Sequence, residues 1–176
     1  MLLQYQEAIA SLLAFLDSGG PVLLMVSGLV FVMWTLIFER IWYYKGGLRR
    51  DTAAALDAWE SRVERKSWGA HKIRDKLISQ VTLRVNQNLS FIATCVAVCP
   101  LLGLLGTVYG MIEVFQVLGV TGGGDARAMA GGVSKATIPT LAGMVAAISG
   151  VFGNTIVTRT AERENQLLED HLTMDH

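Results

Sequence analysis

Three stretches of more than 20 residues contain no charged side chain: residues 18–38, 85–112 and 136–158, with lengths of 21, 28 and 23 residues. A hydrocarbon core of about 30 Å needs roughly 20 helical residues to cross it. In lipid, the backbone of a single segment satisfies its own hydrogen bonds only as a helix. A chain of 176 residues is too short to cover three such helices with other protein. The sequence therefore predicts an all-α polytopic membrane protein with three transmembrane helices.

The composition excludes several classes of function. Apolar residues make up 52% of the chain and charged residues 17%, and its 15 basic and 15 acidic side chains cancel. This balance disfavours a water-soluble enzyme and gives no general electrostatic reason to expect nucleic acid. Cys95 and Cys99 lie one helical turn apart and are predicted to be small apolar residues. The histidines His71, His171 and His176 form no ligand spacing with them, so we predict no metal and no cofactor.

The charges that flank the spans predict the topology. Ten Lys or Arg residues lie between Lys45 and Gln87, whereas residues 1–20 contain none. By the positive-inside rule the N-terminus is periplasmic, the basic segment is cytoplasmic and the C-terminus is cytoplasmic. The first span ends at an aromatic belt, where Glu39, Arg40 and Lys45 mark the exit into water; the belt residues are Trp42, Tyr43 and Tyr44.

The remaining segments complete the expected order. Apolar residues at helical spacing predict an amphipathic helix on the membrane surface at the N-terminus, without the charged start of a signal peptide. The cytoplasmic segment is predicted to be a helical hairpin with a break near residues 67–69, whose second arm continues without interruption into the second span. Long second and third helices thus extend into the cytoplasm. The predicted segments are the interfacial helix 1–20, transmembrane helix 21–44, cytoplasmic helices 45–87, transmembrane helix 88–119, periplasmic loop 120–130, transmembrane helix 131–158 and cytoplasmic helical tail 159–176.

Small residues line the second and third spans. Small side chains let helix backbones approach closely in lipid, where van der Waals contacts drive association. Two such faces provide more contact surface than one pair of helices requires, which favours a homo-oligomer. The predicted packing residues are Gly103, Gly106, Gly110, Gly143, Ala147 and Gly150.

Two motifs carry a family resemblance. The segment LLGLLGTVYGMIEVF at 101–115, preceded by Pro100, and the segment GGVSKATIPTLAGMVAAI at 131–148 resemble the paired motifs of the MotA/TolQ/ExbB proton-channel family, and within it the ExbB branch. The resemblance implies a pentamer in the bacterial inner membrane. Its second and third helices would line a lumen that holds the single transmembrane helices of an ExbD-type partner, which carries the titrating aspartate. Proton flow would then energise a TonB-like protein that acts on outer-membrane receptors.

The resemblance also implies roles for particular residues. By motif position, Thr107 and Thr140 match the lumen-facing threonines of the family, whose hydroxyls can donate and accept hydrogen bonds without a fixed charge. Lys135 stands where the family usually carries an acidic residue, so the sign of the charge is reversed. Pro139 is a second departure, and it removes a backbone hydrogen bond to the carbonyl of Lys135. We therefore predict helix kinks at Pro139 and at Pro100.

The position of Glu113 suggests a partner for Lys135. If the two threonines share a depth, Glu113 and Lys135 lie roughly 9 and 7.5 Å further outward, at about 1.5 Å per residue. Charges inside a membrane usually face the protein interior and pair. One hypothesis is an ion pair, within or between subunits. The alternative is that both side chains extend separately to the outer interface.

Several alternatives for the function remain open. Within the family, a TolQ-like role in envelope integrity fits the same motifs, whereas the larger layout of MotA fits less well. A passive scaffold that only anchors partner helices also predicts small-residue interfaces. A membrane enzyme has little support, because the chain shows no phosphate loop and no convergent set of catalytic residues.

Overall fold

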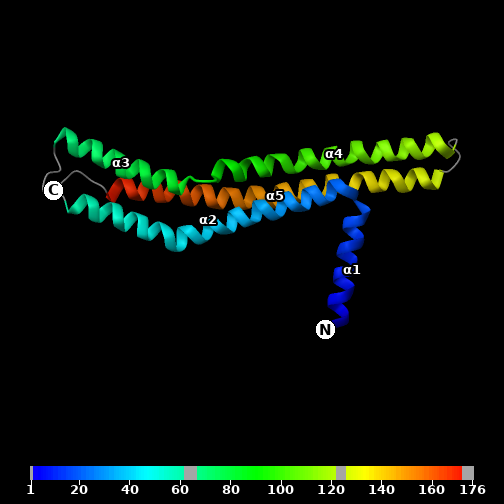
Figure 1. Cartoon of the computed structure of the whole chain (residues 1–176), viewed down its shortest axis with the longest axis horizontal. Coiled ribbons are helices and arrows are strands. Elements are labelled where there is room, and N and C mark those ends of the chain that lie inside the picture. The colour runs from blue at the N-terminus through cyan, green and yellow to red at the C-terminus, as the bar shows by residue number, and fades with distance from the viewer. Residues whose placement is uncertain (1, 62–66, 122–125, 172–176) are drawn as a thin grey trace. The chain divides into compact units, whose positions relative to one another are not determined.

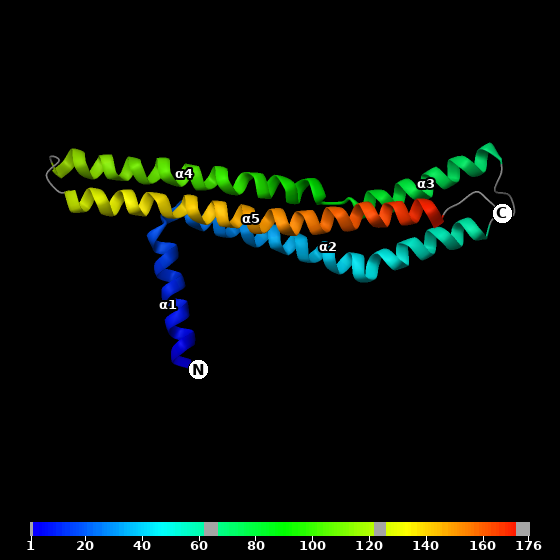
Figure 2. The ribbon, with the colours of Figure 1, turned by 180° about the vertical axis from the view of Figure 1, so that it is seen from behind.

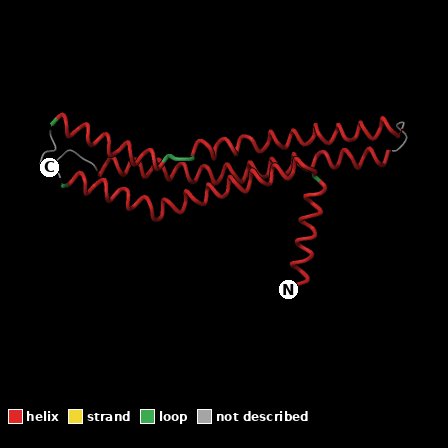
Figure 3. Tube along the Cα trace, in the orientation of Figure 1, coloured by secondary structure: helices red, strands yellow, loops and turns green. Residues whose placement is uncertain are grey.

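The computed structural model describes residues 2–61, 67–121 and 126–171. Within these residues all regular structure is helical (Figure 1, Figure 3). The helices are α1 (Leu2–Ser18), α2 (Gly20–Glu60), α3 (Trp68–Val85), α4 (Leu89–Thr121) and α5 (Ala126–His171). Three segments of the described chain contain helix that is long and apolar enough to cross a membrane: Gly20–Glu60, Trp68–Gly119 and Met129–Asp170. The predicted all-α class with three such helices is confirmed.

The N-terminal helix is separated from the first span by a glycine turn. Gly20 has a φ of +65°, in the left-handed region that glycine adopts at no steric cost. In Figure 1 and Figure 2, α1 turns away from α2 at this point. The sequence correctly predicts a helix here. Its position on the membrane surface stays a prediction.

The predicted end of the first long helix at Tyr44 is wrong. The helix α2 continues through Gly46 and Gly47 to Glu60. Two glycines do not end it because apolar residues recur beyond them at helical spacing, and both Leu48 and Trp59 are buried. The membrane boundary near residue 44 is a separate matter and stays a prediction.

The predicted continuity between the cytoplasmic arm and the second span is also wrong. The helix α3 ends at Val85 and α4 begins at Leu89. Asn88 between them has a φ of 65°, a conformation that asparagine tolerates better than most residues. The backbone N–H of Asn86 donates to the carbonyl of Thr82, which caps α3. The chain therefore has a short interruption that no proline or glycine announces.

Three other predicted boundaries can be compared with the structure, and two of them agree with it. The break before α3 is confirmed, since the Ser67 side chain accepts a hydrogen bond from the N–H of Ala70 and caps the helix. The predicted loop 120–130 is shorter, because α4 reaches Thr121 and α5 starts at Ala126; residues 122–125 lie outside the described residues. The predicted helical tail is confirmed as far as His171, and residues 172–176 again lie outside them.

The chain divides into two compact units, and the first comprises Met1–Met33 and Thr94–Val151. Here α4 and α5 run antiparallel and side by side, as both ribbon views show (Figure 1, Figure 2). Buried positions on α5 recur every three or four residues, so one stripe of the helix faces its neighbours. The buried residues of this stripe are Ala136, Pro139, Gly143, Ala146 and Gly150.

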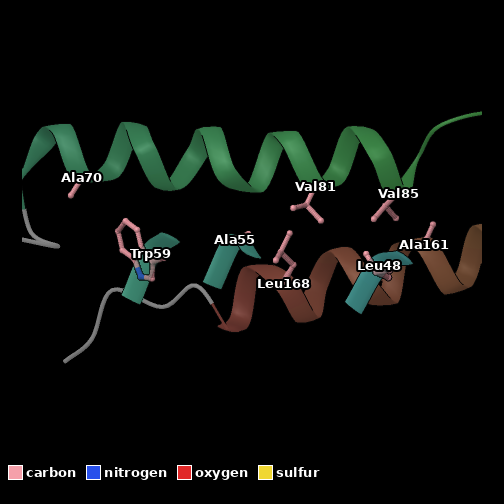
Figure 4. Close-up of a cluster of buried hydrophobic side chains, with 8 residues drawn as sticks. All are labelled: Leu48, Ala55, Trp59, Ala70, Val81, Val85, Ala161 and Leu168. Carbon is pink, nitrogen blue, oxygen red and sulfur yellow. The ribbon is translucent and has the colours of Figure 1, made fainter. Parts of the chain in front are cut away.

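The second unit comprises Trp34–Ala93 and Phe152–His176. Its core is a cluster of buried side chains from α2, α3 and α5 (Figure 4). Trp59 supplies the largest of them and is 2% exposed. The cluster consists of Leu48, Ala55, Trp59, Ala70, Val81, Val85, Ala161 and Leu168. This core explains why the helices stay ordered beyond the apolar stretches.

Alanine substitutions at two glycines of α5 test the contact with α4. A Cβ added to Gly143 would lie 2.6 Å from the carbonyl oxygen of Cys99 and 3.1 Å from the Cα of Gly103, and backbone cannot move aside as a flexible side chain can. We expect Gly143→Ala to lower the free energy of unfolding by about 1–3 kcal/mol, measured by thermal unfolding in detergent micelles. The matched control is Gly131→Ala on the same helix, where no described residue lies within 4 Å of the added atom. That change is expected to be neutral or to stabilise by up to about 1 kcal/mol. Equal unfolding temperatures for the two variants would contradict the close contact.

Candidate functional site

The candidate site lies along the contact between α4 and α5 in the first unit. A Cβ added to Gly110 would lie 2.5 Å from the Cβ of Ala136, and one added to Gly106 would meet the ring of Pro139. One added to Gly103 would lie 3.0 Å from the carbonyl oxygen of Pro139. The two backbones therefore touch with almost no side chain between them. We name this contact the α4–α5 seam; its residues are Gly103, Gly106, Gly110, Ala136, Pro139 and Gly143.

Thr140 connects the two helices across the seam. Its Oγ1 donates a hydrogen bond of 2.8 Å to the carbonyl oxygen of Gly103. This approach depends on glycine, because a Cβ at position 103 would lie 3.0 Å from the Cα of Thr140. A polar side chain inside an apolar segment is thus satisfied by the backbone of the neighbouring helix.

Thr107 bonds differently. Its Oγ1 donates 2.7 Å to the carbonyl oxygen of Leu104 on the same helix, and the side chain faces outward. Both threonine hydroxyls therefore give their proton to a backbone carbonyl. What each hydroxyl still offers to another group is its oxygen lone pairs, so each can accept a further hydrogen bond.

Glu113 and Lys135 come together at one end of the same helix pair. The Nζ of Lys135 lies 3.6 Å from the Oε2 of Glu113, and their side chains are 47% and 44% exposed. The distance is that of an ion pair rather than of a strong hydrogen bond. The neighbouring contact of Gly110 with Ala136 sets this register. Both members of the pair belong to one chain, which is the intrasubunit form of the hypothesis.

Most of the predicted packing residues lie where small size matters. An added Cβ on Gly150 would lie 2.5 Å from the sulfur of Met33 on α2, so this glycine faces the first span. Ala147 is only half-buried, and the buried residue of the stripe is its neighbour Ala146. A shift of one residue moves a side chain by about 100° around a helix. Pro100 and Pro139 lie inside uninterrupted helices, and the predicted kinks stay predictions.

Much of the outer surface of α4 and α5 in the first unit is apolar. Large side chains on α4 and α5 are exposed over more than half of their area, which a soluble monomer rarely tolerates as a continuous surface. Lipid or other transmembrane helices must cover them. Among these residues are Leu101, Leu104, Val108, Ile112, Phe115, Leu141, Met144, Val145 and Ile148.

A polar network in the second unit was not predicted. The sequence placed Arg40 at the exit into water, but its side chain is only 4% exposed. The Nη1 of Arg40 donates 3.0 Å to the carbonyl oxygen of Arg84, near the end of α3, and its guanidinium also pairs with Glu39. Tyr44, one turn further along α2, donates 3.0 Å to the carbonyl oxygen of Val85. Two side chains of α2 therefore satisfy the last carbonyls of α3.

The network continues along α2. The guanidinium of Arg40 lies 5.1 Å from the ring centre of Tyr43, and the Tyr43 hydroxyl donates 2.6 Å to Asp51. Arg84 pairs with the other oxygen of Asp51 at 2.7 Å. The only local signal in the sequence was the spacing of Arg40 and Tyr44, which places both on one face of a helix. Their acceptors lie more than 40 residues away along the chain, so no local pattern could reveal them.

The two cysteines are free thiols buried in α4. This confirms the prediction that they act as small apolar residues. Within the described ranges, no group of three or more His, Cys, Asp or Glu side chains could hold a metal ion. The chemistry of the described site therefore comes from hydroxyl groups, backbone carbonyls and one ion pair.

Comparison with known proteins places the chain in a family. Residues 45–170, which include α3, α4 and nearly all of α5, match the MotA/TolQ/ExbB proton channel family. The chain belongs to this family. The resemblance found in the two motifs is thereby confirmed, and the α4–α5 seam is a helix pair of a MotA/TolQ/ExbB membrane protein.

Individual members of the MotA/TolQ/ExbB family match parts of the chain. The biopolymer transport protein exbB1 of Vibrio cholerae is 36% identical over 88 residues, which are 49% of this chain and 39% of that protein. The biopolymer transport protein ExbB of Helicobacter pylori is 37% identical over 71 residues, 40% of this chain and 49% of that protein. The Tol-Pal system protein TolQ of Haemophilus influenzae is 33% identical over 81 residues, 46% of this chain and 34% of that protein. The matches span less than half the length of each of these relatives.

Replacing Arg40 tests the polar network in this family member. Arg40→Met keeps the volume but leaves the carbonyl of Arg84 without its charged donor. We expect the free energy of unfolding to fall by about 1.5–3 kcal/mol, the usual contribution of a hydrogen bond to a charged group. Arg50→Met on the same helix is the control, because Arg50 is exposed. Thermal unfolding followed by circular dichroism measures both, and an equal effect of the two changes would rule out a structural role of the network.

A charge swap tests the pair of Glu113 and Lys135. Glu113→Lys and Lys135→Glu each place like charges together, whereas the double swap restores an opposite pair. Because both side chains are nearly half exposed, we expect a coupling energy of about 0.2–1 kcal/mol in a double-mutant cycle of thermal unfolding. If the double swap is no more stable than either single swap, the two charges do not interact.

Proposed function

We propose that this chain is an ExbB-like subunit of a proton-driven complex in the bacterial inner membrane. The complex uses the proton motive force to energise transport across the outer membrane through a TonB-like protein. In this proposal the chain catalyses no reaction that forms or breaks covalent bonds. Its task is to surround a proton path and to hold the helices that move.

The observation that carries the proposal is the Thr140 hydroxyl at the α4–α5 seam, with its hydrogen bond to Gly103. Polar groups inside apolar spans are expensive and commonly mark ion or proton pathways. Thr107 adds a second hydroxyl on α4, and Glu113 with Lys135 adds charge at one end of the path. Membership of a proton channel family supports the same assignment.

The hydrogen bonds suggest how the hydroxyls act. Both threonines donate to carbonyls and so have only lone pairs to offer. A protonated carboxyl group on a partner helix has one O–H donor and satisfies this requirement, whereas a carboxylate does not. The threonines would therefore stabilise the neutral, protonated form of the aspartate on an ExbD-like single-span partner. Loss of the proton would release the partner helix, which links proton transfer to movement.

The apolar surface around the seam supports an oligomer. In the proposed assembly five copies form a ring, α4 and α5 line its lumen, and the partner helices fill it. The exposed apolar side chains of α4 and α5 would then face neighbouring subunits, partner helices and lipid.

The distribution of basic residues supports the proposed orientation. The N-terminus lies in the periplasm with α1 on the membrane surface, and the C-terminus lies in the cytoplasm. Residues 21–44, 88–119 and 131–158 are the proposed spans, and residues 45–87 and 159–176 the cytoplasmic parts.

A TolQ-like role is the second candidate. The match to the Haemophilus influenzae TolQ protein favours it, since this identity is close to that of the ExbB relatives. The same proton path would then serve envelope integrity instead of receptor-dependent uptake. Complementation of strains that lack one system or the other separates the two roles.

Replacing Thr140 tests the proton path. We expect Thr140→Val to reduce proton-motive-force-dependent uptake by tenfold or more, because valine keeps the shape but has no hydroxyl. Thr140→Ser is expected to retain most of the activity. The matched control is Thr137→Val on the same helix; among the described residues, its hydroxyl donates to the carbonyl of Ser134 on α5 and not to α4.

Abundance in the membrane and capture of the ExbD-like partner are measured in parallel with uptake. Loss of uptake with intact assembly supports the proton path. Normal uptake by Thr140→Val would leave the seam as a packing contact and favour a passive scaffold.

A further inference from the structure

A charged cavity in the second unit lies apart from the proposed proton path. It has a volume of about 460 Å³ and lies between α2 and α5. Three of the residues that line it are charged: Lys45 and Arg49 on α2 and Glu164 on α5. Tyr44, Leu48, Thr52, Ala53 and Leu56 supply the rest of the lining.

The cavity begins at Tyr44, where the proposed first span ends. By the helical rise, Lys45 and Arg49 lie about 1.5 and 7.5 Å beyond Tyr44. The headgroup layer on each side of a bilayer is roughly 5–8 Å thick, so both cations fall at the depth of lipid phosphates. Glu164 lies six residues, or about 9 Å, beyond residue 158, where the proposed third span ends.

An aromatic stripe leads along α2 to the cavity. Phe38, Trp42, Lys45 and Arg49 follow one another at spacings of four, three and four residues, which places them on one face of the helix. Phe38 is 60% exposed and Trp42 is 81% exposed. The face therefore changes from exposed aromatic rings to cations at the end of the span. A phospholipid has the same order, with an acyl chain followed by a phosphate.

The charges of the cavity lack partners among the described residues. Arg40 pairs with Glu39, and Arg84 pairs with Asp51. In the described chain, no hydrogen bond or ion pair joins Lys45, Arg49 or Glu164 to another residue. Two cations on one wall and a carboxylate on the other are complementary to a ligand that carries both a phosphate and an ammonium group.

We propose that this cavity binds the headgroup of an aminophospholipid, as in phosphatidylethanolamine. Lys45 and Arg49 bind the phosphate, and the Glu164 carboxylate accepts hydrogen bonds from the ammonium group. One acyl chain lies along Phe38 and Trp42. Basic pockets between transmembrane helices are a known type of lipid headgroup site. The proposal concerns a surface away from the seam and does not depend on the proposed proton path.

The charges favour a lipid over a second copy of the chain. An acidic helix of a neighbouring subunit would satisfy Lys45 and Arg49, but it would be repelled by Glu164. An aromatic ring as exposed as Trp42 at the end of a span is typical of contact with the headgroup layer. A neighbouring subunit is nevertheless a distinct outcome of the test.

The test measures lipid binding to the purified chain in a neutral detergent. Dioleoyl phosphatidylethanolamine, phosphatidylcholine and phosphatidylglycerol are titrated separately, and bound lipid is counted by native mass spectrometry. We expect phosphatidylethanolamine to bind about tenfold more tightly than the other two lipids. Phosphatidylcholine has no N–H donor for Glu164, and phosphatidylglycerol has no cation. Phosphoethanolamine without acyl chains is expected not to bind at the same concentrations.

Variants assign the contacts. The double change Lys45→Gln and Arg49→Gln is expected to weaken phosphatidylethanolamine binding at least tenfold. Glu164→Gln is expected to abolish the preference for phosphatidylethanolamine over phosphatidylcholine while binding to phosphatidylglycerol is kept. The matched controls are Arg50→Gln and Glu162→Gln, which are exposed neighbours outside the cavity and are expected to bind like the wild type.

Several outcomes would overturn the proposal. Equal affinity for the three lipids, or equal loss of binding in the controls, would show that no headgroup site exists. Binding of phosphoethanolamine as tight as that of the lipid would indicate a site for a soluble phosphate. If the variants change the oligomer mass while lipid binding stays intact, the occupant is a second copy. If the double variant fails to fold, the headgroup preference of Glu164→Gln decides the question.

Discussion

The direct contact between the backbones of α4 and α5 is the constraint on which the first unit depends. In lipid, apolar side chains gain little by leaving their surroundings, so helices associate through close van der Waals contact and interhelical hydrogen bonds. Glycine at positions 103 and 143 makes that contact possible. The hydrogen bond of Thr140 exists only because the backbones are this close. The register that brings Lys135 to Glu113 follows from the same contact.

Much of the fold could be predicted because membrane thickness and helical periodicity act locally. Three charge-free stretches predicted three spanning helices, and the small residues of the second and third spans predicted which positions pack. The break between α3 and α4 could not be predicted, since it depends on a left-handed Asn88 and on caps from a distant helix. The continuation of α2 through Gly46 and Gly47 was missed for a similar reason. Burial of Trp59 in a tertiary core outweighs the low helix propensity of two glycines.

The candidate site likewise contains features that local sequence predicts and features that depend on distant contacts. The similar depth of Glu113 and Lys135 followed from helical rise once the motifs had placed Thr107 and Thr140 at one depth, and the structure brings the two charged side chains together. Ala147 was predicted to pack, but its neighbour Ala146 is the buried residue. The small size of a residue does not show which side of the helix it occupies, so the sequence could not distinguish the two alanines. Arg40 was predicted to face water because charged side chains at the end of a membrane span are usually exposed to it. Its burial depends on the carbonyl of Arg84, which the sequence places far away. The proton-path roles of Thr107 and Thr140 derive from family resemblance and stay predictions.

The interruption at residues 86–88 also has a mechanical meaning. Side chains of α2 hold the last carbonyls of α3, through Arg40 and Tyr44, whereas three residues outside any helix connect α3 to α4. Non-helical residues between two helices absorb changes of backbone torsion angle that a continuous helix would transmit. The backbone torsion angles of residues 86–88 are therefore not tied to a helix, as those of α3 and α4 are. By contrast, α5 is one unbroken helix from Ala126 to His171, so its backbone offers no such joint.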